Sequence, residues 1–196
     1  MWRYDDSEEG EGVSPTPARI EEKLLGSRTI FVAEPISDKT YRRVASALTL
    51  MEGEDSEKPI RVFVNSPGGS ADSGFAIYDL LKFSSCPVVT LANGLVASSA
   101  VLVFLSGDDG KCLSLPHSRF LLHQPSTYTR GQASDIDITA KEIIKTRSKY
   151  NEIVKLKTGR DVEALEKDAE RDFWMSPEEA KEYRLVDEIV RKSSDL

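Results

Sequence analysis

Two adjacent serines, Ser98 and Ser99, interrupt an apolar run that reads GLVASSAVLVFL. A buried hydroxyl without a partner costs free energy, so this pair needs an explanation. The strand-like stretch CPVVTLAN precedes the run, which becomes helical around Ser98. Amide hydrogens and the positive end of a helix dipole beside Ser98 would favour a developing negative charge, as a nucleophile's site requires. The alternative is packing, in which small residues let a helix approach a sheet closely.

The chain has only two histidines, and His123 is the better candidate for a general base. It ends the apolar stretch SRFLLH and is followed by Gln124-Pro125, where the chain is expected to turn. A histidine at a strand end can reach a neighbouring strand end, as the base of a serine nucleophile must. A purely structural histidine is the alternative. His117 lies in a predicted turn, where we expect it to be exposed.

A carboxylate that orients the histidine would complete the arrangement. The candidates are Asp161, Asp168, Asp172 and Asp187. Asp172 lies in ERDFWMSPEE, between one predicted helix and the next, and a loop carboxylate can point at a site. Spacing alone leaves the choice among the four open.

The turn NSPGGS contains Gly68 and Gly69 and follows the strand-like stretch PIRVFVN. A glycine-rich turn between a strand and a helix can present amide hydrogens to an anion. The segment lacks the Gly-Lys-Ser/Thr ending of a P-loop and does not match G-x-G-x-x-G, so a phosphate site is poorly supported. An oxyanion site and a plain tight turn remain the two interpretations.

Composition limits the classes of function. Of the 196 residues, 39% are hydrophobic and 30% are charged, which is typical of a soluble globular domain. The net charge of −7 argues against nucleic acid or an anionic membrane as a partner. The longest apolar run is interrupted and falls short of the ~20 residues that a membrane span needs.

Cysteine usage and the chain start point to a reducing compartment. Cys86 and Cys112 lie in apolar stretches without metal-ligand spacing, so we expect buried free thiols. The start is acidic and rich in turn residues, unlike a signal peptide. We therefore expect a cytoplasmic protein with a mobile N-terminal arm or propeptide at 1–17 and a single domain at 18–196.

Strand patterns alternate with helix patterns, which predicts an α/β domain with crossover connections. The expected strands cover 28–34, 59–65, 86–93, 111–116, 118–123 and 185–190. The expected helices cover 19–26, 37–52, a segment around 75–81, 133–157, 161–171 and 176–183. The last of these helices carries a capping box of Ser176 and Glu179 with Pro177 in its first turn.

The pattern at 133–157 predicts one long helix that stops at Gly159. A helix of about 25 residues spans roughly 37 Å, which is more than a small domain needs to cover its sheet. Part of the helix either projects to pack on another subunit or curves over its own core.

In combination, these segments resemble the proteolytic subunit of the Clp protease, a family of caseinolytic serine peptidases. The resemblance covers about residues 27–190 in the order of the family. The matching motifs are VNSPGG at 64–69, GLVASSA at 94–100, HQP at 123–125, GQASD at 131–135, ERD at 170–172 and S-EA-EY-LVD at 176–187.

The resemblance implies a role for each site residue. Ser98 aligns with the nucleophile, His123 with the general base and Asp172 with its orienting carboxylate. The backbone amides of Gly69 and Ser99 would form the oxyanion hole, and Gly68 would shape the turn. The reaction would be peptide hydrolysis through an acyl-enzyme, without metal or cofactor.

The resemblance also implies an α/β fold of the Clp/crotonase type, with a long protruding helix that stacks two rings. Family members form a tetradecamer, and an AAA+ ATPase unfoldase feeds unfolded polypeptides into its chamber for degradation to short peptides. Glu170 and Arg171 resemble contacts between the rings. Phe63, Phe83 and Leu115 resemble docking positions for the unfoldase.

The chain departs from the family pattern at four places. Ser99-Ala100 replaces the usual Met-Gly after the nucleophile, and Leu95 replaces a glutamine. The segment STYTRGQ replaces a glycine-rich turn after HQP, and Arg61 and Asn93 occupy docking positions that are usually apolar.

These departures suggest an isoform of a homo- or hetero-oligomeric ring that pairs with a second Clp protease isoform. That second subunit would then do most of the unfoldase docking. The alternatives are a non-catalytic or weakly active structural subunit of a mixed ring and an acyl-CoA enzyme of the crotonase type.

Overall fold

The computed structural model of the chain describes residues 18–195, and the arm predicted at 1–17 lies outside the described residues. The elements alternate as the sequence predicts, so the α/β fold class is confirmed. Their order is α1 (Ala18–Gly26), β1 (Thr29–Val32), α2 (Asp38–Glu54), β2 (Ile60–Ser66), α3 (Ala71–Phe83), β3 (Val88–Ala97), α4 (Ser99–Leu105), β4 (Cys112–Ser114), β5 (Arg119–Leu122), α5 (Ala133–Thr158), α6 (Val162–Asp168), β6 (Phe173–Met175), α7 (Pro177–Glu182), β7 (Glu188–Ile189) and a short 3-10 turn (Ser193–Asp195).

The sheet branches at β3. The strands β1, β2, β3, β4 and β7 are hydrogen-bonded in that order and run parallel, while β5 pairs with the second half of β3 and antiparallel β6 adds to β5. Gly94 separates the two halves at a φ of 113°, and a Cβ there would lie 2.6 Å from the Asn65 amide oxygen. Only glycine fits this branch point, because it combines a positive φ with such close packing.

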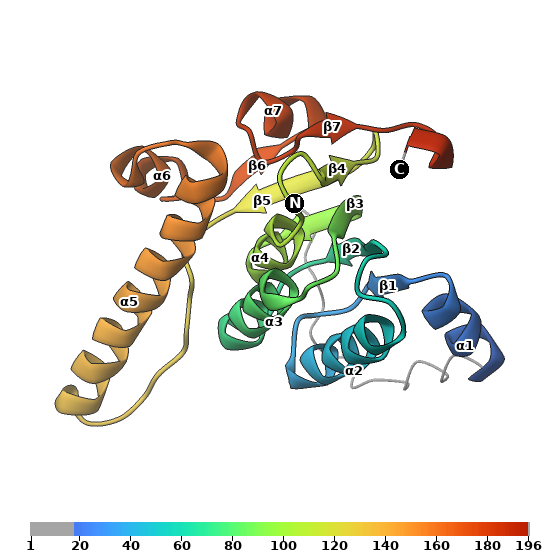
Figure 1. Cartoon of the computed structure of the whole chain (residues 1–196). Coiled ribbons are helices and arrows are strands. Elements are labelled where there is room, and N and C mark those ends of the chain that lie inside the picture. The colour runs from blue at the N-terminus through green and yellow to red at the C-terminus, as the bar shows by residue number, and fades with distance from the viewer. Residues whose placement is uncertain (1–17, 196) are drawn as a thin grey trace.

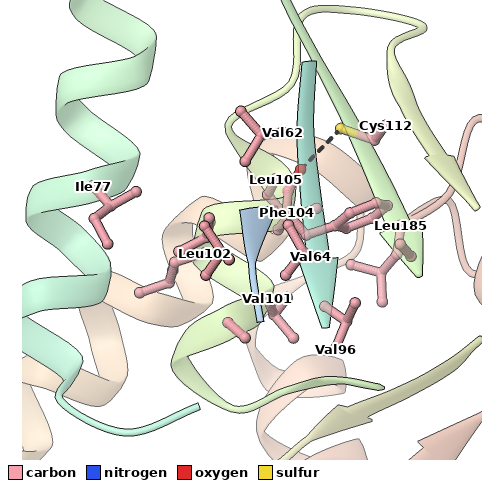
Figure 2. Close-up of a cluster of buried hydrophobic side chains, with 14 of the residues drawn as sticks. Val62, Val64, Ile77, Val96, Val101, Leu102, Phe104, Leu105, Cys112 and Leu185 are labelled. Carbon is pink, nitrogen blue, oxygen red and sulfur yellow. Dashed lines mark hydrogen bonds between the residues drawn. The ribbon is translucent and has the colours of Figure 1, made fainter. Parts of the chain in front are cut away.

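Helix α4 fills the centre of the core, and every residue from Ser99 to Leu105 is buried. A helix that is apolar all round has no face to offer water and must be covered on all sides. Figure 2 shows its side chains among those of β2, β3 and α3. The Phe104 ring lies 5.4 Å from that of Phe120, and the Phe104 carbonyl accepts the Cys112 thiol at 3.5 Å. Cys86 and Cys112 are buried free thiols, as predicted.

Helix α5 projects from the body of the domain (Figure 1). Its buried residues lie only in its C-terminal half, at Tyr150, Asn151, Val154 and Thr158. The N-terminal half carries exposed isoleucines instead, at Ile136, Ile138 and Ile144. Of the two sequence interpretations, the projecting helix is therefore the one that the chain adopts. Gly159 ends it in the left-handed conformation, with a φ of 72°.

Two local predictions differ from the structure. Strand β3 continues to Ala97 instead of ending near 93, because its second half finds a new partner in β5. Strand β6 is absent from the sequence prediction, because three residues carry too little periodicity to indicate a strand. Its pairing with β5 is a contact between distant parts of the sequence, and that contact positions the site described next.

Candidate active site

Ser98, His123 and Asp172 lie together at one edge of the sheet because three neighbouring strands end there. In the parallel β3–β5 pair Ala97 is opposite Leu121, and in the antiparallel β5–β6 pair Leu122 is opposite Phe173. One step beyond these pairs stand Ser98 after β3, His123 after β5 and Asp172 before β6.

His123 and Asp172 face each other across the end of the β5–β6 ladder. Their Nδ1 and Oδ1 atoms are 3.5 Å apart, which is longer than the usual N–H···O distance of about 2.9 Å. The histidine side chain is 32% exposed and the carboxylate 63% exposed, so solvent reaches both groups. Because Nδ1 faces the carboxylate, Nε2 is the ring nitrogen left for a serine.

Ser98 occupies a sharp turn between β3 and α4. Its φ of 56° and ψ of −128° lie in a region that non-glycine residues rarely adopt, at a cost of about 1–3 kcal/mol. The Ser98 amide donates to the Leu121 carbonyl at 3.0 Å, which fixes the turn to β5. A strained turn between a strand and a helix is a known way to hold a nucleophilic serine out of the backbone.

The Gly68-Gly69 turn lies on the other side of Ser98. A Cβ on Gly68 would lie 2.6 Å from the Ser98 Cβ and 2.7 Å from the Ala97 carbonyl, so no side chain fits there. Ile36 holds the turn from outside, since its amide donates to the Gly68 carbonyl at 2.8 Å and its carbonyl accepts the Ser70 amide at 2.9 Å. Among residues 18–195, the Gly69 and Ser99 amides have no hydrogen-bond partner.

A cleft of about 390 Å³ opens in front of the serine and the histidine. The sequence alone does not identify the α5 residues that line this cleft. Thr146 and Tyr150 lie one turn apart on α5, so the helical period alone places both on one face. The lining residues are Gly69, Ser70, Ala71, Phe75, Ser98, Ser99, Leu102, His123, Pro125, Ser126, Thr146 and Tyr150.

Helix α5 also makes polar contacts with the site. The Tyr150 hydroxyl donates to the Ser98 carbonyl at 3.3 Å, and burial raises the pKa of this phenol above its ordinary value. Arg147 donates to the Gln124 side chain at 3.3 Å and lies 3.3 Å from Glu166 on α6. The C-terminal half of α5 therefore contacts the backbone of Ser98 and the side chain of Gln124, which follows His123.

The other aspartates considered from the sequence have different positions. Asp161 precedes α6 and is exposed, and Asp168 accepts the Tyr183 hydroxyl at 2.8 Å. Asp187 binds Lys157 through both carboxylate oxygens at 2.7 Å. His117 is exposed, as expected. Only Asp172 of the four lies beside His123.

The residues predicted to contact other chains lie elsewhere. Phe63 and Leu115 pack against one small cluster on the sheet, and Phe31 stacks on Phe63 at 4.9 Å. Phe83 stands apart at the end of α3 and is 88% exposed. Arg61 precedes Phe63 by two residues on the same face of β2, and its guanidinium donates to the Ser27 carbonyl at 2.9 Å.

Glu170 and Arg171 are exposed and directly precede Asp172. Within residues 18–195, no three His, Cys, Asp or Glu side chains are grouped as a metal site would need. The helices of this described range all fall short of the length and apolar composition that a membrane-spanning helix requires.

The chain is similar to known proteins over most of its length. The family model described as Clp protease matches residues 14–193. A protein of Rhizobium johnstonii named ATP-dependent Clp protease proteolytic subunit 3 is 42% identical over 93% of each chain. One of the same name from Rhizobium meliloti is 42% identical over the full length of both chains. A solved mutant of ClpP1 from Listeria monocytogenes superposes with a TM-score of 0.83 at 34% identity, covering 89% of this chain and 98% of its own.

Proposed function

Because the chain belongs to the Clp protease family, we propose that it is a serine endopeptidase subunit with Ser98 as its nucleophile. One observation carries the proposal more than any other. The ends of β3, β5 and β6 meet at one sheet edge, with Ser98, His123 and Asp172 in neighbouring positions. A serine, a histidine and a carboxylate so arranged are suited to acyl transfer.

The first half of the reaction forms an acyl-enzyme. The Ser98 Oγ attacks the carbonyl carbon of the scissile peptide while His123 Nε2 takes the hydroxyl proton. Asp172 accepts a hydrogen bond from Nδ1–H, which holds the tautomer and stabilises the charged ring. The tetrahedral intermediate collapses, the C–N bond breaks and His123 returns the proton to the leaving amine.

The second half releases the acyl group. A water molecule gives a proton to His123 Nε2 and attacks the ester carbonyl. Collapse of this second intermediate breaks the bond to Ser98 Oγ, which regains its proton from His123. No metal or cofactor takes part in either half.

The amides of Gly69 and Ser99 are the proposed donors to the oxyanion, with Gly68 shaping the turn. Both amides are without partners among residues 18–195. Ser99 directly follows Ser98, and Gly69 lies in the glycine turn that packs against Ser98 and lines the same cleft. Donors that are already in place cost no reorganisation when the negative charge develops. The side chain at 99 does not enter this role, so the serine that replaces the usual methionine leaves the hole intact.

We also propose that the subunit works inside a tetradecamer of two stacked rings and degrades unfolded polypeptides in the cytoplasm. The projecting half of α5 supports this, because its isoleucines at 136, 138 and 144 leave an apolar surface for a second copy to cover. Glu170 and Arg171 are the proposed polar contacts between the rings.

An AAA+ ATPase unfoldase is the proposed partner on the ring's outer face, with Phe63, Phe83 and Leu115 as the proposed docking positions. Arg61 beside Phe63 adds a charge to that apolar surface and would weaken docking. This supports a mixed ring in which a second Clp protease isoform supplies most of the docking. Mixing the purified subunits and measuring unfoldase binding tests it, and normal binding by this chain alone would contradict it.

A weakly active structural subunit is the second candidate. The 3.5 Å separation of His123 from a largely exposed Asp172 favours it, since a loosely held carboxylate orients the base poorly. Catalytic hydrogen bonds often tighten only when substrate is bound, so full activity remains compatible with this spacing. The acyl-CoA alternative is set aside because the chain belongs to the Clp protease family.

Hydrolysis of a fluorogenic peptide by the purified, assembled chain separates the two candidates. The proposal predicts turnover that disappears in Ser98→Ala while native mass spectrometry still finds the same assembly. Turnover that Ser98→Ala leaves unchanged would contradict the proposal. No turnover by the chain alone or mixed with a partner isoform would favour the structural subunit.

A further inference from the structure

The buried Tyr150 side chain of α5 is hydrogen-bonded to the peptide group that follows the proposed nucleophile. The Tyr150 hydroxyl donates to the Ser98 carbonyl at 3.3 Å, and the Val101 amide donates to the same oxygen at 3.0 Å. Both lone pairs of this carbonyl are therefore in use. Val101 belongs to the first turn of α4, whereas Tyr150 comes from a distant part of the sequence.

The Ser98 carbonyl and the Ser99 amide are two ends of one planar peptide group. In a trans peptide these bonds point in opposite directions, so a change in the direction of the C=O turns the N–H with it. The torsion that sets this direction is ψ of Ser98, which is −128° in a strained region of the backbone. A strained peptide keeps its orientation only where its surroundings hold it.

Tyr150 is well placed to hold it. The residue is only 8% exposed, and its buried neighbours Asn151 and Val154 hold that part of α5 against the core. Burial raises the pKa of the phenol, so the hydroxyl stays protonated and remains a donor. A hydrogen bond to a carbonyl also polarises the amide on the other side of the group, which makes that N–H a stronger donor.

We propose that Tyr150 is a positioning residue that fixes the Ser98–Ser99 peptide group, so that the Ser99 amide is held ready for the oxyanion. The inference rests on the proposed function, because the Ser99 amide matters only if Ser98 is acylated. It assigns to α5 a part in the chemistry of the site, in addition to any contact that this helix makes with other subunits.

The variant Tyr150→Phe tests the inference, since it keeps the ring and removes only the donor. We expect kcat for a fluorogenic peptide to fall about 3- to 10-fold, less than the ~100-fold cost of losing an oxyanion donor outright, with KM unchanged. The affinity of a peptide aldehyde, whose adduct places an oxyanion in the same position, should fall by the same factor. A role in packing alone would not move kcat and aldehyde affinity in parallel.

Thr158→Val is the matched control on the same helix. It removes another buried hydroxyl, which donates to the Val154 carbonyl at 2.8 Å. We expect its kcat and aldehyde affinity to match those of the wild type. Each variant is assayed well below its own melting temperature and scaled to the assembled fraction, so loss of stability is not mistaken for loss of chemistry.

The inference is overturned if Tyr150→Phe keeps the wild-type kcat, if it changes only KM, or if Thr158→Val loses as much. These outcomes all require a wild type that turns over through Ser98. A wild type without such turnover contradicts the proposed function first, and the inference about Tyr150 falls with it.

Discussion

His123 Nδ1 lies 3.5 Å from Asp172 Oδ1, one step beyond the last pair of the β5–β6 ladder. The register of that short ladder decides which carboxylate meets the histidine. A shift of one residue would turn the aspartate to the other face of the sheet. The three residues of β6, Phe173 to Met175, thus place Asp172 beside His123, the base that we propose it orients.

Asp172→Asn should lower kcat by about 100-fold or more without preventing folding, because the amide favours the wrong tautomer of His123. Peptide hydrolysis at neutral pH measures the loss. Asp168→Asn is the control, since Asp168 accepts the Tyr183 hydroxyl away from the cleft and should keep near-normal turnover. Equal turnover in the wild type and Asp172→Asn would show that the carboxylate does not orient the base.

Gly68→Ala should remove activity and destabilise the fold by about 1–3 kcal/mol. A Cβ would lie 2.6 Å from the Ser98 Cβ, at a φ of 91°. Gly53→Ala is the matched control, because that glycine lies in α2 with open space around it and should gain up to about 1 kcal/mol. Urea unfolding and peptide turnover report both quantities. A Gly68→Ala variant as active as Gly53→Ala would contradict the close packing of Gly68 against Ser98.

Asp187→Ala, at a residue that does not line the cleft, should cost about 3 kcal/mol of stability. It leaves the half-buried Lys157 ammonium without its partner and removes the acceptor of the Cys112 amide at 2.8 Å. Arg43→Ala, which breaks an exposed pair with Glu34, should cost less than about 1 kcal/mol. Urea midpoints at one fixed protein concentration compare the two. Equal midpoints would contradict the claim that the more buried Lys157–Asp187 pair stabilises the chain more than the exposed Arg43–Glu34 pair.

The stability of the chain should decrease in mild alkali because of Cys112. Burial raises the pKa of this thiol, whereas the unfolded chain ionises at about 8.5. Above that pH the unfolded state releases a proton that the folded state keeps, so the free energy of unfolding falls as pH rises. In Cys112→Ala the fall between about pH 8.5 and pH 10 should be smaller. Parallel pH curves for both proteins would rule out the thiol as the cause.

Local signals in the sequence were sufficient for most helix boundaries. The helix predicted from residue 37 begins with Ser37 accepting from the Thr40 amide, Ser176 and Glu179 form the predicted capping box, and Gly159 ends α5. Each of these signals joins residues at most four positions apart, so it can be recognised in the sequence before the fold is known. Local sequence also marks the glycine turn, Ser98 and His123 as candidates, with a purely structural role as the alternative for each.

The rest of the site depends on pairings between distant segments. Asp172 could be selected from four aspartates only through a family resemblance, because the β5–β6 register that positions it is invisible in local sequence. Tyr150 reads as one more apolar position of a long helix, and nothing nearby indicates that its hydroxyl reaches Ser98. Tertiary packing decides both positions.

The measurement that tests the central claim most directly is covalent labelling by a fluorophosphonate, with the modified residue identified by mass spectrometry. The neighbouring serine supplies the control, because the Ser99 hydroxyl is buried and, within residues 18–195, has no hydrogen-bond partner. We predict that the assembled wild type and Ser99→Ala are labelled at position 98, and that Ser98→Ala is not labelled. Labelling at another residue, or undiminished labelling of Ser98→Ala, would contradict the claim that Ser98 is the nucleophile.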